Sequence, residues 1–377
     1  MIARGIDGAR GVLVRAPNWL GDALAALPLL QALHAAARTH GTSANGELPL
    51  ACVAPRALQA LADESLVGVR WIDPDAPVAA WRGFGTAILL TGSMRSALCA
   101  LAAGIPRRIG FARDGRGLLL SEWVAPAALA GAAVQTVRGG RSSSRRRLGP
   151  AHAPRPLGRS VCELGALLGV VVADPAPALV PSAQARARAA QRLIRVGLST
   201  GPFALINVGG RAGSAKALDP VQWGRIARAL ATRGLPVLAV AGPGEEDALE
   251  TLLQNHPFAA VARDPVADLC ELAALAARAA FVVTTDTGPR HVAAAVGARV
   301  LVLFGPTDPR HTDGGGAALA EIALDKSCGP CHQERCPLPP QFARRCLLDI
   351  DPEHVADAAL ALLRSDPPRS LRADLQP

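Results

Sequence analysis

Short runs of Val, Ile and Leu alternate along this chain with longer stretches rich in Ala and Leu. Runs that are apolar throughout are typical of strands buried on both faces, and the longer stretches have the length and composition of helices. Strands that alternate with helices predict parallel sheets with helices on both faces. The runs expected to be strands are residues 11–15, 48–54, 69–72, 86–92, 203–210, 235–244, 281–288 and 299–308.

The pattern occurs twice, once in each half of the chain. A chain of 377 residues is long enough for two domains of ordinary size. The Pro-rich segment 173–182 lies between the two series and is predicted to be the linker. We therefore expect an α/β protein with two Rossmann-like, doubly wound domains, residues 1–180 and residues 181–377, of which the second ends in a helix.

The composition argues against a nucleic-acid partner. Lys and Arg number 40 and Asp and Glu number 31, so the net charge is +9, but all the basic residues except Lys216 and Lys326 are arginines, a bias typical of high-GC coding. Aromatic residues make up 3% of the chain, whereas proteins that bind single-stranded nucleic acid need aromatic side chains for base stacking. The densest basic run, residues 137–158, is predicted to be a loop. It either contacts phosphate groups of a substrate or of anionic lipid, or is a solvated insertion.

No apolar segment is expected to cross a membrane. Uninterrupted apolar runs stay below the roughly 18 residues of a spanning helix. Near the N-terminus the apolar stretch is broken by Arg15, Pro17, Asn18 and Asp22, unlike the apolar region of a signal peptide. We expect a cytoplasmic protein, and a peripheral contact with a membrane surface stays open.

Polar residues in the strand-to-helix turns of the first half are candidate site residues, because doubly wound sheets bind ligands beyond the carboxyl ends of their strands. Asp22 lies at the start of a helix. It either caps that helix or acts as a general base that takes the proton of an attacking hydroxyl. The other candidates are assigned to the acceptor side, with surface residues as the alternative, and they are Asn18, Ser93, Arg95 and Arg107.

Two turns of the second half carry residues suited to a phosphorylated ligand. Gly-rich residues 209–213 precede Ser214 and Lys216, where a compact positive charge suits a phosphate. The spacing differs from that of a P-loop, so no ATPase is predicted, and a plain Gly-rich loop is the alternative.

The second of these turns is Asp286-Thr287-Gly288, which leaves an apolar run and opens a helix. The free N–H groups of a helix start suit a diphosphate, and the Asp286 carboxylate can accept hydrogen bonds from sugar hydroxyls. His291 lies one turn into the helix and can face the same ligand. The alternative is a capped turn with a histidine satisfied by the protein.

Cysteines fall into two groups. Four are scattered in apolar surroundings and are predicted to be buried thiols. The others follow the spacing C-x2-C-x4-C-x9-C, which suggests a structural zinc site, with unligated thiols or a facultative disulfide as the alternatives. This clustered set is Cys328, Cys331, Cys336 and Cys346.

Four blocks of the chain resemble, in the same order, the ADP-heptose:lipopolysaccharide heptosyltransferases. They are VRAPNWLGDALAALPLLQAL at 14–33, SMRSALCALAAGIPRRIGF at 93–111, GSAKALDPVQWGRIARAL at 213–230 and DTGPRHVAAAVGARVLVLFGPTDP at 286–309. The resemblance implies the GT-B fold, in which two Rossmann-like domains face a central cleft. It also implies inverting transfer of L-glycero-D-manno-heptose from ADP-heptose to the lipopolysaccharide inner core, with no metal or other cofactor required for catalysis.

The resemblance also assigns roles to residues. Asp22 matches the catalytic base and Lys216 a contact to the donor phosphates. The donor sugar and diphosphate site matches Asp286, Thr287, Gly288 and His291. The implied partners are ADP-heptose and a lipid-linked lipopolysaccharide core acceptor at the inner face of the inner membrane. The chain is most similar to the heptosyltransferase II type, and the alternative is a relative that uses another nucleotide sugar or another acceptor.

Overall fold

The computed structural model describes most of the chain, in two compact units. Residues up to Val124 and from Leu157 to Leu179 form the first unit, and Val180–Arg310 with Leu319–Arg364 form the second. The change of unit after Leu179 lies in the Pro-rich segment between the two series of strands. The described residues are 10–40, 49–112, 115–124, 128–129, 136–138, 141–143, 151–152, 157–211, 213–255, 260–262, 265–311 and 319–364.

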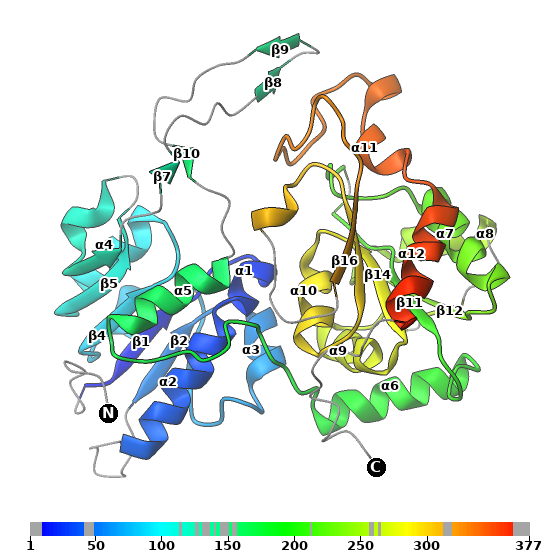
Figure 1. Ribbon diagram of the computed structural model, residues 1–377. Helices are drawn as coiled ribbons and strands as arrows, with labels where there is room; N and C mark the ends of the chain where they lie inside the picture. The colour runs from blue at the N-terminus through cyan, green and yellow to red at the C-terminus, as the bar shows by residue number, and fades with distance from the viewer. Residues whose placement is uncertain are drawn as a thin grey trace. The chain divides into compact units, whose positions relative to one another are not determined.

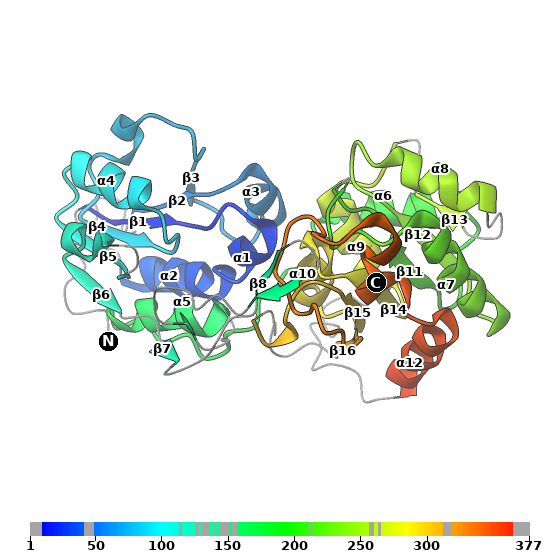
Figure 2. The same cartoon turned by 90° about the horizontal axis from the view of Figure 1, so that it is seen from above.

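The first unit is built on a six-stranded parallel sheet (Figure 1). Its strands, in spatial order, are β3 (Arg70–Ile72), β2 (Leu50–Val53), β1 (Val12–Arg15), β4 (Thr86–Leu89), β5 (Arg107–Phe111) and β6 (Glu122–Val124). Helix α4 (Met94–Ala102) packs on one face, and α2 (Leu27–His40) and α5 (Leu157–Ala166) cover the other (Figure 2). The remaining elements are α1 (Leu20–Leu24), α3 (Arg56–Ala62) and the short 3-10 helices η1 (Val78–Trp81) and η2 (Arg116–Leu119).

The second unit repeats this plan with another six-stranded parallel sheet. In spatial order its strands are β13 (Ala260–Val261), β12 (Val237–Val240), β11 (Ala204–Asn207), β14 (Phe281–Thr285), β15 (Val300–Phe304) and β16 (Leu319–Ala323). Helices α7 (Pro220–Thr232) and α12 (Pro352–Arg364) pack on one face, and α9 (Leu269–Arg278) and α10 (Gly288–Ala295) on the other (Figure 1). The other helices are α6 (Ala183–Arg195), α8 (Glu246–Asn255), η3 (Pro309–His311), η4 (Pro340–Phe342) and α11 (Arg345–Leu348).

Both sheets have the strand order third, second, first, fourth, fifth, sixth. The predicted pair of Rossmann-like, doubly wound folds is therefore confirmed. In such a sheet the chain reverses its direction of travel beside the first strand, between β1 and β4 and between β11 and β14. Doubly wound sheets bind their ligands beyond the carboxyl ends of the strands at this switch point.

Four strands of the two six-stranded sheets were not predicted, and they lie toward the outside of those sheets: β5, β6, β13 and β16. Strand β5 begins with Arg107 and Arg108, and β16 is only partly buried, so neither is a continuous apolar run. Outer strands are covered less completely than central ones, and polar residues are tolerated there.

One helical segment, Leu20–Arg38, is long and apolar enough to span a membrane by length and composition alone. Half of it is buried inside the first unit, and Leu27, Leu29 and Leu30 are fully covered. This burial is what a core helix of a doubly wound domain requires.

The basic segment 137–158 lies largely outside the described residues. Its described part includes β8 (Thr136–Arg138) and β9 (Arg141–Ser143), which pair antiparallel. A second short pair joins β7 (Ala128–Leu129) with β10 (Ala151–His152). The described part of the segment therefore contains short paired strands where an irregular loop was expected.

Candidate functional site

A buried carboxylate in the second unit organises the candidate site. Strand β14 ends at Thr285, and α10 begins at Gly288, with Thr287 at the N-cap. Between them, Asp286 is only 3% exposed. Its Oδ2 accepts hydrogen bonds from Lys216 Nζ at 3.0 Å and from Thr307 Oγ1 at 2.7 Å.

These partners come from three loops at one edge of the sheet. Lys216 follows β11, Asp286 follows β14, and Thr307 follows β15. The carboxyl ends of these neighbouring parallel strands meet at the switch point of the doubly wound sheet, where ligands bind. The topology thus brings together residues that lie far apart in the sequence.

A buried arginine completes the cluster. Arg290 on α10 is 3% exposed, and its guanidinium lies 3.4 Å from Asp286 Oδ1. The same guanidinium stands 5.3 Å from the centre of the Phe304 ring, an attractive cation–π arrangement. Arg290 therefore stabilises the Asp286 carboxylate from the interior of the second unit.

The charges of the cluster leave Lys216 available to an anion. Burial by itself would raise the pKa of the Asp286 carboxyl, but the charges of Lys216 and Arg290 and the hydrogen bond from Thr307 outweigh it and hold the pKa below its ordinary value. Asp286 is therefore a carboxylate facing two cations. The Lys216 side chain is 37% exposed, and an ammonium has three donors, of which Asp286 uses one.

This geometry changes the role expected for Asp286. The sequence suggested a direct contact between its carboxylate and sugar hydroxyls. In the structure the carboxylate is covered and receives hydrogen bonds from protein side chains. Its contact with Lys216 fixes the position of the ammonium. Thr307 and Arg290 were missed by the sequence analysis, although both lie in the quoted block 286–309.

The Gly-rich turn after β11 is shaped mainly by packing. A Cβ at Gly209 would lie 2.0 Å from Oε2 of Glu245, which accepts a hydrogen bond from the Gly242 amide at 2.9 Å. The absence of a side chain at Gly209 therefore makes room for Glu245. Farther along, the Ser214 hydroxyl accepts the Lys216 amide at 3.2 Å and so helps to shape the lysine turn.

Glu245 is a further polar residue that the sequence analysis missed. It follows β12, the neighbour of β11, at the carboxyl end of the sheet. Doubly wound domains that bind nucleotides commonly place an acidic residue after the second strand, where it can accept hydrogen bonds from ribose hydroxyls. That positional rule was the signal that could have found it.

His291 is a neutral group at neutral pH. Burial lowers the pKa of its imidazole to about 3, and the charge of Arg290 adds to this effect. The side chain is half-buried, and His291 lies three residues after Gly288, the first residue of α10. It can therefore offer a ligand an uncharged ring nitrogen.

Acid should destabilise the second unit through His291. The unfolded imidazole has the ordinary pKa of 6.5, so it takes up a proton at pH values where the folded imidazole does not. The stabilisation is complete above pH 6.5 and is lost as the pH falls from there toward 3. Urea unfolding at about pH 7 and about pH 5 should show a smaller loss for His291→Gln than for the wild type. His354→Gln, an exposed change on α12, serves as the control, and an equal acid loss in His291→Gln would contradict the assignment.

In the first unit, Asp22 does not cap its helix. The N-cap of α1 is Trp19, and Asp22 lies in the first turn of the helix with an exposed side chain. The partial positive charge of a helix start favours its ionised form. Asp22 is therefore not the N-cap residue, and its carboxylate is accessible to solvent.

The loop before Asp22 is held by a buried guanidinium. Arg15, at the end of β1, donates to Asn18 Oδ1 at 2.6 Å and to the carbonyl oxygens of Ala16 and Val53. The Arg15 side chain thus ties the exposed Asn18 to the end of the sheet. Arg15 is another residue that the sequence analysis did not single out.

The remaining acceptor-side candidates differ in availability. Ser93 caps α4 by accepting the Ser96 amide at 3.2 Å, and Arg95 is exposed beside it. Arg107 lies in β5 and makes a two-point ion pair with Glu122 at 2.6 and 3.0 Å, with a third bond to the Leu167 carbonyl at 2.9 Å. Because its guanidinium is engaged in the sheet, we leave Arg107 out of the site.

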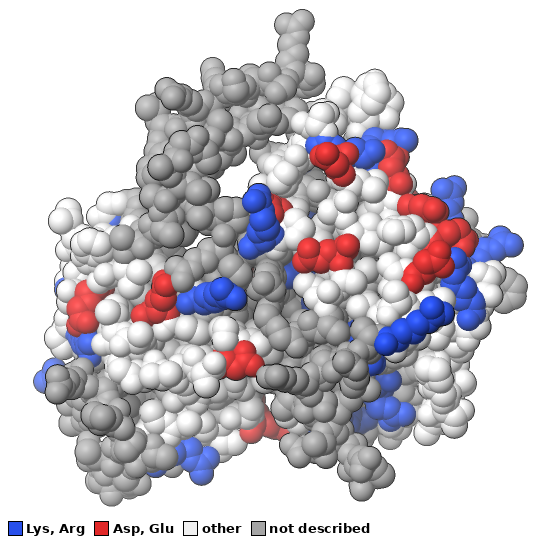
Figure 3. All heavy atoms as spheres, viewed as in Figure 1, with Lys and Arg blue, Asp and Glu red and all other residues white. Residues whose placement is uncertain are grey.

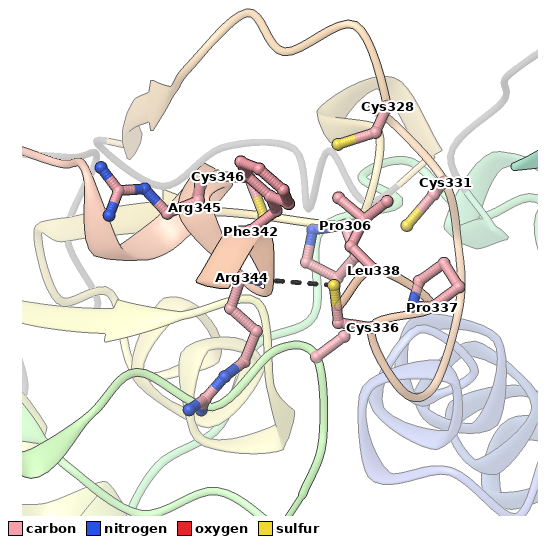
Figure 4. Close-up of a pocket in the computed structure, with 11 residues that line it drawn as sticks. Pro306, Cys328, Cys331, Cys336, Pro337, Leu338, Phe342, Arg344, Arg345 and Cys346 are labelled. Carbon is pink, nitrogen blue, oxygen red and sulfur yellow. Dashed lines mark hydrogen bonds between the residues drawn. The ribbon is translucent and has the colours of Figure 1, made fainter. Parts of the chain in front are cut away.

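The clustered cysteines line one pocket of the second unit (Figure 4). All four are free thiols, and burial together with the other three thiols raises the pKa of Cys346 to about 11. Across the described ranges, no three His, Cys, Asp or Glu side chains are drawn together as metal ligands. The lining includes Ala215 and Pro306, neighbours of Lys216 and Thr307.

Charges on the face shown in Figure 3 are of mixed sign. Among the described residues there, Lys and Arg are interspersed with Asp and Glu.

Comparison with known proteins identifies similar sequences. Residues 158–341 match the model of glycosyltransferase family 9 (heptosyltransferase). Lipooligosaccharide heptosyltransferase 2 of Campylobacter jejuni is 27% identical over 164 residues, which are 42% of this chain and 50% of that protein. Lipopolysaccharide heptosyltransferase 1 of Pseudomonas aeruginosa is 33% identical over 132 residues, or 35% of this chain and 37% of that protein. The matches thus span about half or less of the length of these curated relatives.

A solved structure extends the likeness over more of the chain. The Escherichia coli ADP-heptose lipopolysaccharide heptosyltransferase II matches with a TM-score of 0.65, over 94% of this chain and 98% of that one. The sequence identity is 22%, so the match shows a shared fold.

Proposed function

Because residues 158–341 match the model of glycosyltransferase family 9 (heptosyltransferase), we propose that the chain transfers a heptose from ADP-heptose to the core sugar of a lipid-linked lipopolysaccharide, with inversion at the transferred carbon. The observation that carries the proposal is the half-exposed Lys216 held by Asp286 and Thr307 at the switch point of the second sheet. An ammonium fixed there suits the diphosphate of a nucleotide sugar.

The donor would bind to the second unit. Lys216 pairs with the diphosphate, and at the start of α10 the Gly288 amide and the Thr287 hydroxyl contact its oxygens. We assign the ribose hydroxyls to Glu245 and an uncharged contact to His291. Asp286 acts as a positioning residue, because it touches Lys216 and is covered from solvent.

The reaction would be a single in-line displacement. The acceptor hydroxyl attacks the anomeric carbon as its bond to the ADP oxygen breaks, and Asp22 takes the hydroxyl proton. Lys216 and the helix start offset the negative charge that grows on the leaving ADP. Asn18, Ser93 and Arg95 are proposed as acceptor contacts. Because this acceptor is lipid-linked, we place the protein at the cytoplasmic face of the inner membrane.

Calorimetric titration with ADP-heptose, and in parallel with UDP-, GDP- and dTDP-sugars, tests the donor. Selective binding of ADP-heptose supports the proposal. Selective binding of another nucleotide sugar replaces the substrate and keeps the reaction class. Transfer to lipid-linked core acceptors that carry one or no inner-core heptose then tests the heptosyltransferase II assignment.

Lys216→Ala should weaken donor binding by about 10- to 150-fold, because it removes a charge-assisted hydrogen bond worth about 1.5–3 kcal/mol. The fold should persist, because Asp286 keeps Thr307 and Arg290. Lys326→Ala removes the chain's other lysine, which pairs with Asp349 at 2.8 Å, and is the matched control. Calorimetry measures both, and equal donor affinity in the two variants would remove Lys216 from the site.

A further inference from the structure

The segment between β16 and η4, residues 324–339, has few internal features that would fix its conformation. It contains no helix or strand, and none of its side chains is buried. Loops of this length without secondary structure are uncommon in compact domains. Burial of apolar side chains, the usual means of fixing a chain, is therefore not available to this segment.

The segment contains three cysteines, whose thiol groups lie at one pocket. Cys328, Cys331 and Cys336 are among its few partly covered residues, and Cys346 reaches the same pocket from α11. Figure 4 shows the four cysteine side chains around this pocket, with Cys328 and Cys331 on the same loop. The Sγ of Cys336 already accepts the Arg344 amide at 3.4 Å, the kind of outer hydrogen bond that steadies a metal-bound thiolate.

We propose that Cys328, Cys331, Cys336 and Cys346 bind one thiophilic metal ion, Zn²⁺ in the first instance, which fixes this segment over the donor site. Four thiolates in tetrahedral array are a preferred Zn²⁺ environment, and C-x2-C is the usual spacing of its first two ligands. In the described residues no three of these side chains are already placed as ligands, so binding requires the four sulfurs to move closer together. Each thiol that ligates the ion releases its proton to solvent.

The segment is tied to both loops that shape the donor cluster. The carbonyl of Glu334 accepts the Ala215 amide at 2.8 Å, and the Arg344 guanidinium donates to the Ala217 carbonyl at 3.0 Å, so both neighbours of Lys216 are held. The Pro306 carbonyl, next to Thr307, accepts the His332 amide at 2.7 Å. The metal would therefore be structural, and its loss would loosen Lys216 and Thr307.

Metal content is the direct test. The full chain is purified under reducing conditions without added chelator and analysed by elemental mass spectrometry. We expect one Zn²⁺ per chain, lost in Cys331→Ser with Cys336→Ser, and retained in Cys99→Ser, a partly buried thiol of the first unit. Metal retained in the double variant would overturn the proposal, as would a wild type that neither contains nor takes up Zn²⁺. A disulfide among these cysteines in the reduced preparation would also overturn it.

Chelator treatment of the wild type covers the case in which the double variant does not fold. Removal of the ion should lower the unfolding temperature of the second unit, and adding Zn²⁺ back should restore it. An unfolding temperature that stays the same after chelator treatment and after addition of Zn²⁺ would count against a structural metal. These readings do not depend on any donor. Loss of the metal should also lower the affinity for ADP-heptose, and this expectation rests on the proposed function. If the affinity does not change, the metal result still stands.

Discussion

Asp22→Asn should lower the rate of sugar transfer by about 10²- to 10⁴-fold, the range associated with loss of a general base. The amide keeps the shape of the side chain but cannot take the proton of the acceptor hydroxyl. The side chain is exposed in the first turn of α1, so the fold should be unaffected. Single-turnover transfer assays at saturating donor measure the effect.

Two controls make this result specific. Glu64→Gln removes another exposed carboxylate of the first unit and should leave the transfer rate unchanged. Donor affinity of the Asp22 variant, measured by calorimetry, should match the wild type, because the donor residues lie in the second unit. Transfer by Asp22→Asn at close to the wild-type rate would reject Asp22 as the base.

Asp286→Asn should destabilise the second unit by about 3–5 kcal/mol, the usual cost of removing one member of a buried ion pair. The change leaves the Arg290 guanidinium, which is 3% exposed, without its carboxylate. It also releases Lys216, so donor affinity should fall together with stability. Urea unfolding and donor calorimetry on the same preparation separate the two effects.

Asp349→Asn is the matched control for stability. Asp349 also pairs with a lysine and an arginine, Lys326 and Arg345, but at a partly exposed position where water replaces lost partners. The loss in stability should therefore be much smaller there. If the two variants lose equal stability, Asp286 is not the buried centre of the cluster.

The central strands could be predicted because each carries its own local signal. In β1, β2, β4, β11, β14 and β15, every residue is buried, so an apolar run in the sequence is sufficient. The same holds for the helix starts at Asp219 and Ser93, where a capping side chain immediately precedes the helix. Outer strands lacked this signal because they are covered on fewer sides.

By itself, the sequence determined that the chain forms two doubly wound α/β domains, and it pointed to the turns that hold Asp22, Lys216 and Asp286. These features depend on near neighbours in the chain. Only the tertiary structure decided what those residues touch. Asp286 became the buried holder of Lys216 because Thr307 and Arg290 meet it at the edge of the sheet. These partners depend on which loops meet after folding. Hydrophobic periodicity repeats over a few residues, so it does not predict contacts between loops that lie far apart in the sequence.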